Sequence, residues 1–284
     1  MHAPLVWHRL ARDRWALVGL AILTALTLAA LLAPWLAPAD PIRGALRRSL
    51  QPPSGAFLLG TDAQGRDVLS RVLYGARLSL AVGLISQSVA CLLGLGLGLA
   101  AGYYGRWVDA AVMRVADVTL AFPSLLLLIA IAAAVKPSLP LVFVVIGVVG
   151  WAGMARLVRG QVLVVRGLEY VQAARAVGAS DARIVARHLL PNVVAPVIVA
   201  ATLGIGGAIM AEAALSFVGL GAQPPTPSWG AMVADGRDLL RVAPWVSLYP
   251  GLAIGLAVLG VNLVGDGLRD ALDVRLHVAG RAVA

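Results

Sequence analysis

Residues 78–105 read LSLAVGLISQSVACLLGLGLGLAAGYYG, and none of these 28 residues is Asp, Glu, Lys or Arg. A helix that crosses the hydrocarbon core of a bilayer needs about 20 apolar residues. Five more long windows also lack charge: 15–39, 118–135, 137–155, 188–211 and 242–265. The sequence therefore predicts an all-α membrane protein with six transmembrane helices.

One further uncharged stretch, residues 213–234, is not counted as a span. Its second half contains Pro224, Pro225 and Pro227 beside Trp229. Proline has no amide hydrogen to donate and its ring clashes with the preceding turn. We therefore expect this second half to be a loop.

The composition is that of a chain that lies mostly in lipid. Of its 284 residues 60% are hydrophobic and 13% are charged, and the mean hydropathy is +0.88. A soluble domain is roughly 45–50% apolar and about 25% charged. These values exclude a water-soluble globular enzyme and a disordered chain.

The basic excess gives an orientation. The net charge is +9, from 22 arginines and Lys136 against 14 acidic residues. With the N-terminus inside, 14 basic residues fall in inner segments and 9 in outer ones. Because basic loops favour the cytoplasmic side, we expect both termini in the cytoplasm. The arginines are expected to mark cytoplasmic loops and to lie near anionic headgroups of the membrane lipid, and nucleic acid is not an expected partner.

The charged segments divide the chain into five regions. They are a cytoplasmic tail (1–14), a first transmembrane helix (15–38), an extracytoplasmic loop (39–75), a five-helix core (76–268) and a cytoplasmic tail (269–284). Within the outer loop, Arg66–Arg77 alternates apolar and charged residues at helical spacing. It is expected to lie along the membrane surface as an amphipathic helix.

Small residues recur at every fourth position in two windows. Gly94, Gly98 and Gly102 form one row, and Gly251 and Gly255 form another. Such spacing allows close approach of helices or subunits, although glycine is also common in membrane helices generally. The sequence leaves both interpretations open.

The longest inner segment, residues 156–192, is predicted to be a helical hairpin. Strong helix formers fill Glu169–Val177, and Gly178 supplies a stop. Ser180 is expected to cap a second helix, which Pro191 then ends or kinks. A hairpin of this size suits docking of a partner, with a solvated basic surface as the alternative.

Three groups of residues in this segment match a known pattern: Gln172-Ala173-Ala174, Gly178 and His188-Leu189-Leu190-Pro191. Their spacing resembles the EAA loop of ABC importer permeases, which forms the coupling helix that docks on a cytoplasmic ATPase. Gln172 stands where that family has Glu, and Glu169 is a candidate substitute. The resemblance implies these ATPase-coupling residues: Glu169, Gln172, Ala173, Ala174, Gly178, Ala179, Ser180, Leu190 and Pro191.

The resemblance extends over residues 57–275. The stretches that carry it include Leu59-Gly60-Thr61-Asp62, Gly65–Arg71, Glu212–Gly221 and Gly265–Asp273. They resemble the C-type permease subunit of dipeptide, oligopeptide and nickel importers, with a type I ABC importer fold. This implies a bacterial inner-membrane complex with a second homologous permease, two ATPase subunits and an extracytoplasmic substrate-binding protein. Short peptides are the implied cargo, with a nickel chelate, glutathione or another small solute as alternatives.

The chain itself contains no chemistry for ATP hydrolysis. Its only lysine, Lys136, is followed by Pro137, so no phosphate-binding loop is present. Cys91 is the only cysteine, and no His cluster has metal-ligand spacing. We expect a non-catalytic subunit with no metal site, whose partner ATPases bind ATP and Mg.

Polar residues in the spans, and charged residues in the outer loop after the fifth span, are candidates for other roles. Glu212, Ser216 and Asn262 are candidate pore or gating residues. An acidic residue in a span is functional by default, so Glu212 offers an alternative: a self-sufficient proton-coupled secondary transporter. A structural partner for an outer Arg is its plainer role. Candidate contacts for the binding protein are Asp235, Arg237, Asp238 and Arg241, with ordinary surface charge as the alternative.

Overall fold

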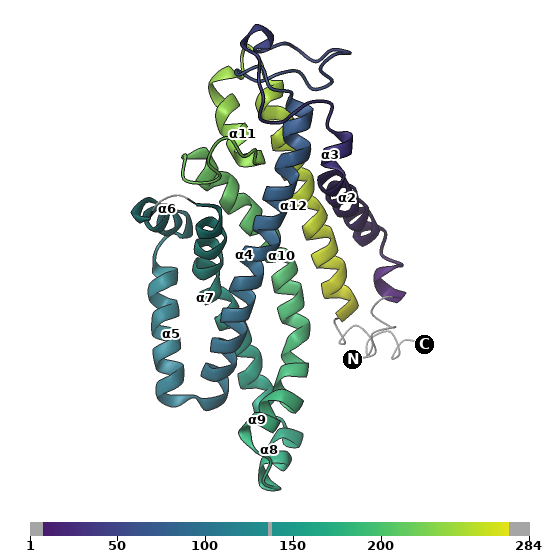
Figure 1. Ribbon diagram of the computed structural model, residues 1–284. Helices are drawn as coiled ribbons and strands as arrows, with labels where there is room; N and C mark the ends of the chain where they lie inside the picture. The colour runs from purple at the N-terminus through teal and green to yellow at the C-terminus, as the bar shows by residue number, and fades with distance from the viewer. Residues whose placement is uncertain (1–7, 136–137, 273–284) are drawn as a thin grey trace.

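The computed structural model describes residues 8–135 and 138–272, which form a bundle of long helices (Figure 1). The long helices are α2 (Arg14–Leu31), α4 (Val68–Tyr104), α7 (Leu139–Arg166), α10 (Leu190–Phe217) and α12 (Trp245–Leu272). The shorter ones are α3 (Ala33–Leu36), α5 (Arg106–Ala121), α6 (Ser124–Ala134), α8 (Glu169–Ala176), α9 (Asp181–Ile184) and α11 (Trp229–Gly236). Short 3-10 turns, η1 (Leu46–Arg48) and η3 (Arg237–Leu239), and a π-helical turn, η2 (Val185–Leu189), complete the described residues.

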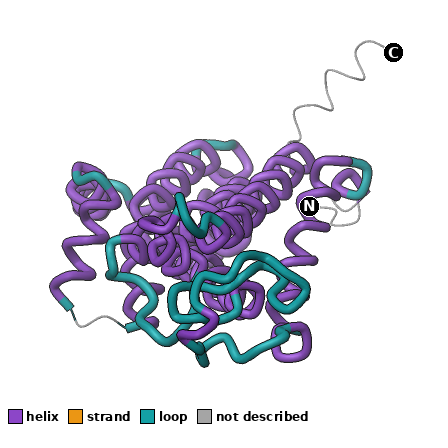
Figure 2. The backbone as a smooth tube through the Cα atoms, turned by 90° about the horizontal axis from the view of Figure 1, so that it is seen from above, coloured by secondary structure: helices purple, strands orange, loops and turns teal. Residues whose placement is uncertain are grey.

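The all-α membrane fold is confirmed. Within the described residues, five helices are long and apolar enough to cross a bilayer, or six if α5 and α6 form one broken span. Viewed from above, the loops gather over the near end of the bundle (Figure 2). The opposite end carries α8 and α9, and α2 begins and α12 ends toward that side (Figure 1).

The third span differs from its prediction. Residues 118–135 are not one helix, because α5 and α6 meet at an angle of 92°. Phe122, at the junction, has extended backbone angles, φ −90° and ψ 138°. Pro123 follows it, and a proline ring disfavours helical geometry in the residue before it. Residues 118–121 therefore end α5, which begins at Arg106.

Helix α4 also begins earlier than expected. The segment Arg66–Arg77 is not a separate surface helix, because residues 68–77 form the first turns of α4. Asp67 caps this helix by accepting the Ser70 amide at 2.7 Å. The 37 residues of α4 are about 55 Å long, so the helix exceeds the bilayer core of about 30 Å.

The first glycine row lies at the interface between α4 and α7. A Cβ atom added to Gly94 would lie 2.5 Å from the Met154 side chain, and one on Gly98 would lie 2.6 Å from the Ala155 carbonyl. Only glycine permits this approach. By contrast, a Cβ on Gly251 of α12 meets nothing within 4 Å in this chain.

Two proline-containing regions also differ from expectation. Pro191 neither ends nor sharply kinks the helix, since Asp181–Phe217 runs on as one helical stretch. The π-helical turn before Pro191 widens the backbone ahead of the ring. Separately, the expected loop stops at Ser228, whose hydroxyl accepts the Ala231 amide at 3.1 Å and so starts α11.

Helix α2 is held at the edge of the bundle. Arg77 of α4 donates from Nε to the Ala30 carbonyl at 2.6 Å and from Nη2 to the Leu31 carbonyl at 2.9 Å. These carbonyls belong to the last turn of α2, where no helical donor remains. A cation at this end also suits the helix dipole.

Candidate functional site

The α8–α9 hairpin projects from one end of the bundle (Figure 1). Gly178 in its turn has φ +82°, a left-handed conformation that glycine adopts without strain. The Gly178 amide donates to the Arg175 carbonyl, and the Ala179 amide donates to the Ala174 carbonyl. These bonds close the C-terminus of α8 and turn the chain toward α9.

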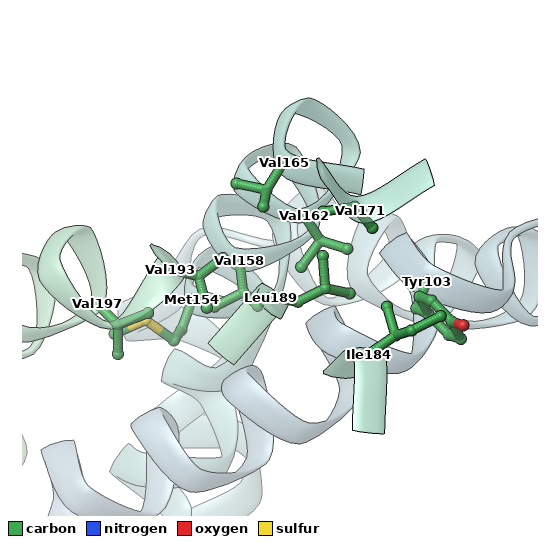
Figure 3. Packing of buried hydrophobic residues seen from close by; sticks show 10 residues of the cluster. All are labelled: Tyr103, Met154, Val158, Val162, Val165, Val171, Ile184, Leu189, Val193 and Val197. Atoms are coloured by element: carbon green, nitrogen blue, oxygen red, sulfur yellow. The ribbon is translucent and has the colours of Figure 1, made fainter. Parts of the chain in front are cut away.

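The inner face of the hairpin is part of the main hydrophobic core. Val171 of α8, Ile184 of α9 and Leu189 of η2 are each at most 1% exposed. Figure 3 shows them packed with side chains of α4, α7 and α10: Tyr103, Met154, Val158, Val162, Val165, Val193 and Val197. The hairpin and these helices therefore share one packed core.

Polar contacts fix the same junction. The Tyr103 hydroxyl of α4 donates to Asp181 Oδ1 at 2.6 Å, and the Arg175 guanidinium lies 5.5 Å from the Tyr103 ring centre. Ser180 occupies the N-cap of α9 as expected, but its side chain makes no capping hydrogen bond. Asp181, in the first turn of α9, accepts the hydrogen bond from the Tyr103 hydroxyl.

Gln172 has a role that the usual glutamate cannot fill. Its Nε2 donates to the Arg166 carbonyl at 2.8 Å, and Arg166 Nη1 in turn donates to the Gly102 carbonyl at 2.7 Å. A carboxylate has no hydrogen to donate. The amide at this position thus links α8 to the end of α7.

The face of the hairpin that points away from the hydrophobic core, called its outer face, is partly apolar. Leu168, Tyr170 and Val177 are 42%, 44% and 84% exposed. Of the predicted coupling residues, Glu169 is also exposed, whereas Leu190 and Ala179 pack against the core. Exposed apolar side chains on a projecting hairpin are typical of a protein-docking surface.

Glu212 lies inside the bundle, not at an arginine. It is 1% exposed, and Ser216 Oγ donates to its Oε1 at 2.6 Å. Its Oε2 is buried without a hydrogen-bond partner among the described residues. The hydroxyls of Ser79 and Ser228 also face the carboxyl group. The expectation that Glu212 pairs with an outer Arg is therefore wrong. Glu212 instead links α10 to α4 and to the start of α11.

Trp229 secures α11 beside this buried group. It is fully buried; its amide donates to Ser79 Oγ at 3.2 Å, and its Nε1 donates to the Val72 carbonyl at 3.0 Å. Both partners belong to α4. The short outer helix is therefore fixed to the long helix that reaches the hairpin.

A cavity of about 810 Å³, lined by residues of α11 and of the start of α4, lies at the end of the bundle opposite the α8–α9 hairpin and is called the outer cavity below. Its lining includes Asp235, Arg237 and Asp238, three of the four predicted binding-protein contacts, and also Ser216. Arg241 is not part of the lining. The sequence missed Arg66 and Arg71, which also line the cavity, because they were expected at the membrane surface.

An ion-pair network forms one wall of this cavity. Arg66 Nε lies 2.6 Å from Asp62 Oδ2, and Arg71 Nε lies 3.5 Å from the same oxygen. The Nη2 atoms of Arg66 and Arg71 are 3.7 and 3.9 Å from Asp235 Oδ2. Burial raises the pKa of Asp235, an effect that Arg71 and Arg66 oppose.

A second feature, a groove of about 450 Å³, runs between α4 and α10. Along its otherwise apolar surface lie Gln87, Ser88, Cys91 and Thr202. The two hydroxyls donate to carbonyls four residues earlier, at 2.7 and 2.9 Å, but the Gln87 amide has no hydrogen-bond partner among the described residues. Asn262, on α12, is exposed and does not line this groove.

The acidic residues of α5 pair with α7. Asp109 accepts hydrogen bonds from Nε and Nη2 of the Arg159 guanidinium. Asp117 likewise pairs with Arg156. Within residues 8–135 and 138–272, no three His, Cys, Asp or Glu side chains are placed to hold a metal ion.

A bundle of membrane-crossing helices with a packed hairpin at one end is the architecture of a multi-pass membrane protein. The chain belongs to the family of binding-protein-dependent transport system inner membrane components, whose profile matches residues 94–278. Residues 4–53 match the N-terminal TM domain of oligopeptide transport permease C. The chain is thus a permease subunit of an ABC importer in a bacterial inner membrane. Such subunits are generally non-catalytic and work with an ATPase and a substrate-binding protein.

Named relatives cover most of the chain. The dipeptide transport system permease protein DppC of Alkalihalophilus pseudofirmus is 48% identical over 94% of this chain and 88% of its own length. The di/tripeptide transport system permease protein DppC of Pseudomonas aeruginosa is 46% identical over 96% and 92%. The glutathione transport system permease protein GsiD of Pectobacterium atrosepticum is 48% identical over 79% and 74%.

The fold is shared with a solved transporter. A chain of the inward-facing MetNI methionine ABC transporter matches with a TM-score of 0.57 and 20% sequence identity. The match covers 72% of this chain and 96% of that one.

Proposed function

We propose that this chain is the C-type permease subunit of an ATP-driven importer of short peptides. It forms half of the translocation pathway beside a second homologous permease, with two cytoplasmic ATPases and an extracytoplasmic binding protein. The relatives named for dipeptides and di/tripeptides support this cargo. Glutathione, named for another relative, or a nickel chelate is the alternative cargo. The chain contributes no nucleotide site, so ATP and Mg bind to the partner ATPases.

The proposed coupling mechanism rests on the two different faces of the α8–α9 hairpin. Its inner face shares a core with α4, α7 and α10, while its outer face exposes Tyr170 and Val177. An ATPase that grips the outer face therefore moves the long helices as well. This assignment places the hairpin, the start of α2 and the end of α12 in the cytoplasm. A self-sufficient carrier driven by Glu212 needs no such surface.

The turn at Gly178 gives a direct test. A Cβ atom added there meets nothing within 4 Å, so the main perturbation is to the left-handed backbone. That conformation costs an ordinary L-residue about 1–2 kcal/mol. This free energy lowers the population of the native turn relative to other hairpin conformations by roughly 5- to 30-fold. In the reconstituted importer, Gly178→Val should lower peptide uptake per ATP hydrolysed by a factor in that range.

Gly178→Asn is the matched control, since Asn tolerates left-handed angles. It should retain coupling at the same expression level. Equal uptake per ATP in wild type, Gly178→Val and Gly178→Asn would show that the turn plays no part in coupling.

The groove between α4 and α10 is proposed to face the translocation pathway. Gln87 lies ten residues beyond Arg77, about 15 Å along the helix, and so near mid-membrane. An amide without a partner is costly in lipid but not in a water-filled path. This proposal adds residues that the sequence did not select.

Cys91 provides a native probe of that groove, since it is the only cysteine. A membrane-impermeant methanethiosulfonate should label it in the assembled transporter and should not label Cys91→Ser. Leu93→Cys in the Cys91→Ser background is the control, because Leu93 is 40% exposed but lies about 200° around α4. Labelling at residue 93 but not at residue 91 would assign the pathway to another face.

A further inference from the structure

The outer cavity is large enough to hold a small molecule. Its volume of about 810 Å³ lies in the range of small-ligand sites, about 300–1,000 Å³. It is lined by the loop before α4, the first turn of α4, the end of α10 and the loop after it, α11 and η3. The hairpin mechanism makes no use of it.

The lining of the cavity contains a guanidinium with unused donors. Arg71 is 3% exposed and makes one hydrogen bond, from Nη1 to the Pro41 carbonyl at 3.2 Å. Its contacts with Asp62 and Asp235, at 3.5 and 3.9 Å, are ion pairs longer than good hydrogen bonds. Since guanidinium has five N–H donors in a fork that matches a carboxylate, Arg71 has donors left for a ligand.

Asp62 is only a weak competitor of that ligand for Arg71. Its Oδ1 accepts the backbone amides of Gln64 and Arg66, and its Oδ2 accepts Arg66 Nε at 2.6 Å. The carboxylate is fully engaged in holding the wall. It therefore fixes Arg66 and leaves the inner Arg71 only loosely paired.

The rim of the cavity carries both signs of charge. Asp235 is half-exposed, and its nearest guanidinium nitrogen is 3.7 Å away. Arg237 lies 5.7 Å from the Phe217 ring centre, which holds it at the cavity edge, and pairs loosely with Asp238 at 3.4 Å. Three Arg and two Asp side chains in the lining, with Asp62 behind them, make the site close to neutral overall.

We propose that this cavity binds a short peptide as a zwitterion, with its carboxylate at Arg71 and Arg237 and its ammonium group at Asp235. The mixed charge suits a ligand with one charge of each sign better than a metal cation or a polyanion. A dipeptide spans about 7 Å between its ends, which fits within the cavity. The inference rests on the proposed peptide function, and it assigns Asp235 and Arg237 to the cargo instead of the binding protein.

The test uses the complete transporter in nanodiscs without its binding protein. The probe is L-alanyl-L-phenylalanine, compared with its C-terminal amide and its N-acetyl form, by saturation-transfer NMR. We expect the zwitterion to bind and each blocked form to bind about tenfold more weakly, the loss of one charge-assisted hydrogen bond. Equal signals from all three peptides would overturn the proposal.

Matched variants locate the site. Arg237→Gln and Asp235→Asn lie outside the spans and should each weaken zwitterion binding about tenfold. Arg241→Gln, in the same outer segment but outside the cavity lining, should leave it unchanged. If Arg237→Gln instead weakens only the binding protein's affinity for the transporter, the residue belongs to the docking surface and the proposal fails.

The two proposals can fail separately. Wild-type transporter that imports no peptide, even with its binding protein, would contradict the peptide function. Wild-type transporter that imports peptide normally but shows no binding-protein-free peptide signal would contradict only the cavity site.

Discussion

Replacing Gly98 by Ala should push α4 and α7 apart. The added Cβ would lie 2.6 Å from the Ala155 carbonyl oxygen and 2.7 Å from Val158 Cβ. Carbon-to-oxygen contacts of this kind are normally about 3.3–3.6 Å. The two helices must therefore separate locally by about 0.7–1 Å, and the carbonyl belongs to a backbone that cannot rotate away.

The expected cost follows from overpacking a close interface. Such insertions typically cost about 1–3 kcal/mol. Gly96 offers the matched control two residues away, because a Cβ there meets nothing within 4 Å. Both replacements gain the same helix propensity, about 0.5–1 kcal/mol, so the difference between the two variants isolates the packing term.

The assay is thermal denaturation of the purified subunit or complex in detergent. With about 2–4 °C per kcal/mol for a chain of this size, Gly98→Ala should denature about 2–12 °C below Gly96→Ala. Gly96→Ala should match or slightly exceed wild type. Coincident midpoints for the two variants would refute the assignment of the glycine row to the α4–α7 contact.

Three further changes test other contacts. Arg77→Ala removes the two hydrogen bonds that end α2 and should lower the denaturation midpoint by several degrees, with faster proteolysis of α2 as a second readout. Tyr103→Phe keeps the ring but loses the hydroxyl bonded to Asp181; uptake per ATP should fall while the denaturation midpoint changes by about 2–4 °C or less. Glu212→Gln should be tolerated and Glu212→Ala should destabilise, because only the latter leaves Ser216 without its acceptor. Loss of uptake in Glu212→Gln at unchanged stability would instead reveal a proton-dependent role.

The helices were predictable because apolar length alone decides which segments can cross a bilayer. The bend at Phe122–Pro123 was missed because the prediction counted charged residues and gave no weight to a single proline within an apolar window. The predicted start of α4 was too late because its first turns carry two charged residues, Arg71 and Arg77. Arg71 pairs with Asp62 and Asp235, and Arg77 caps the end of α2.

The candidate sites also include features that the sequence could predict and features that it could not. The hairpin was predictable from local signals, namely helix formers followed by Gly178. The hydrogen bond from Gln172 to a carbonyl was not, since it depends on where α7 ends. The outer cavity joins Arg71 to Asp235, which are 164 positions apart. No local pattern reveals that pairing, and the charged residues around it resemble ordinary surface charge until the helices are assembled.

Helix α4 has a consequence that reaches beyond its packing. It runs without a proline from the lining of the outer cavity to Tyr103 beside the hairpin. Proline is a common cause of sharp helix kinks, so α4 lacks the usual point at which its two ends could tilt apart. A rotation of about 5° pivoted at the hairpin end displaces the opposite end by roughly 5 Å over the length of about 55 Å. If an ATPase moves the hairpin, as we propose, α4 can carry that movement directly to the residues that line the cavity near its other end.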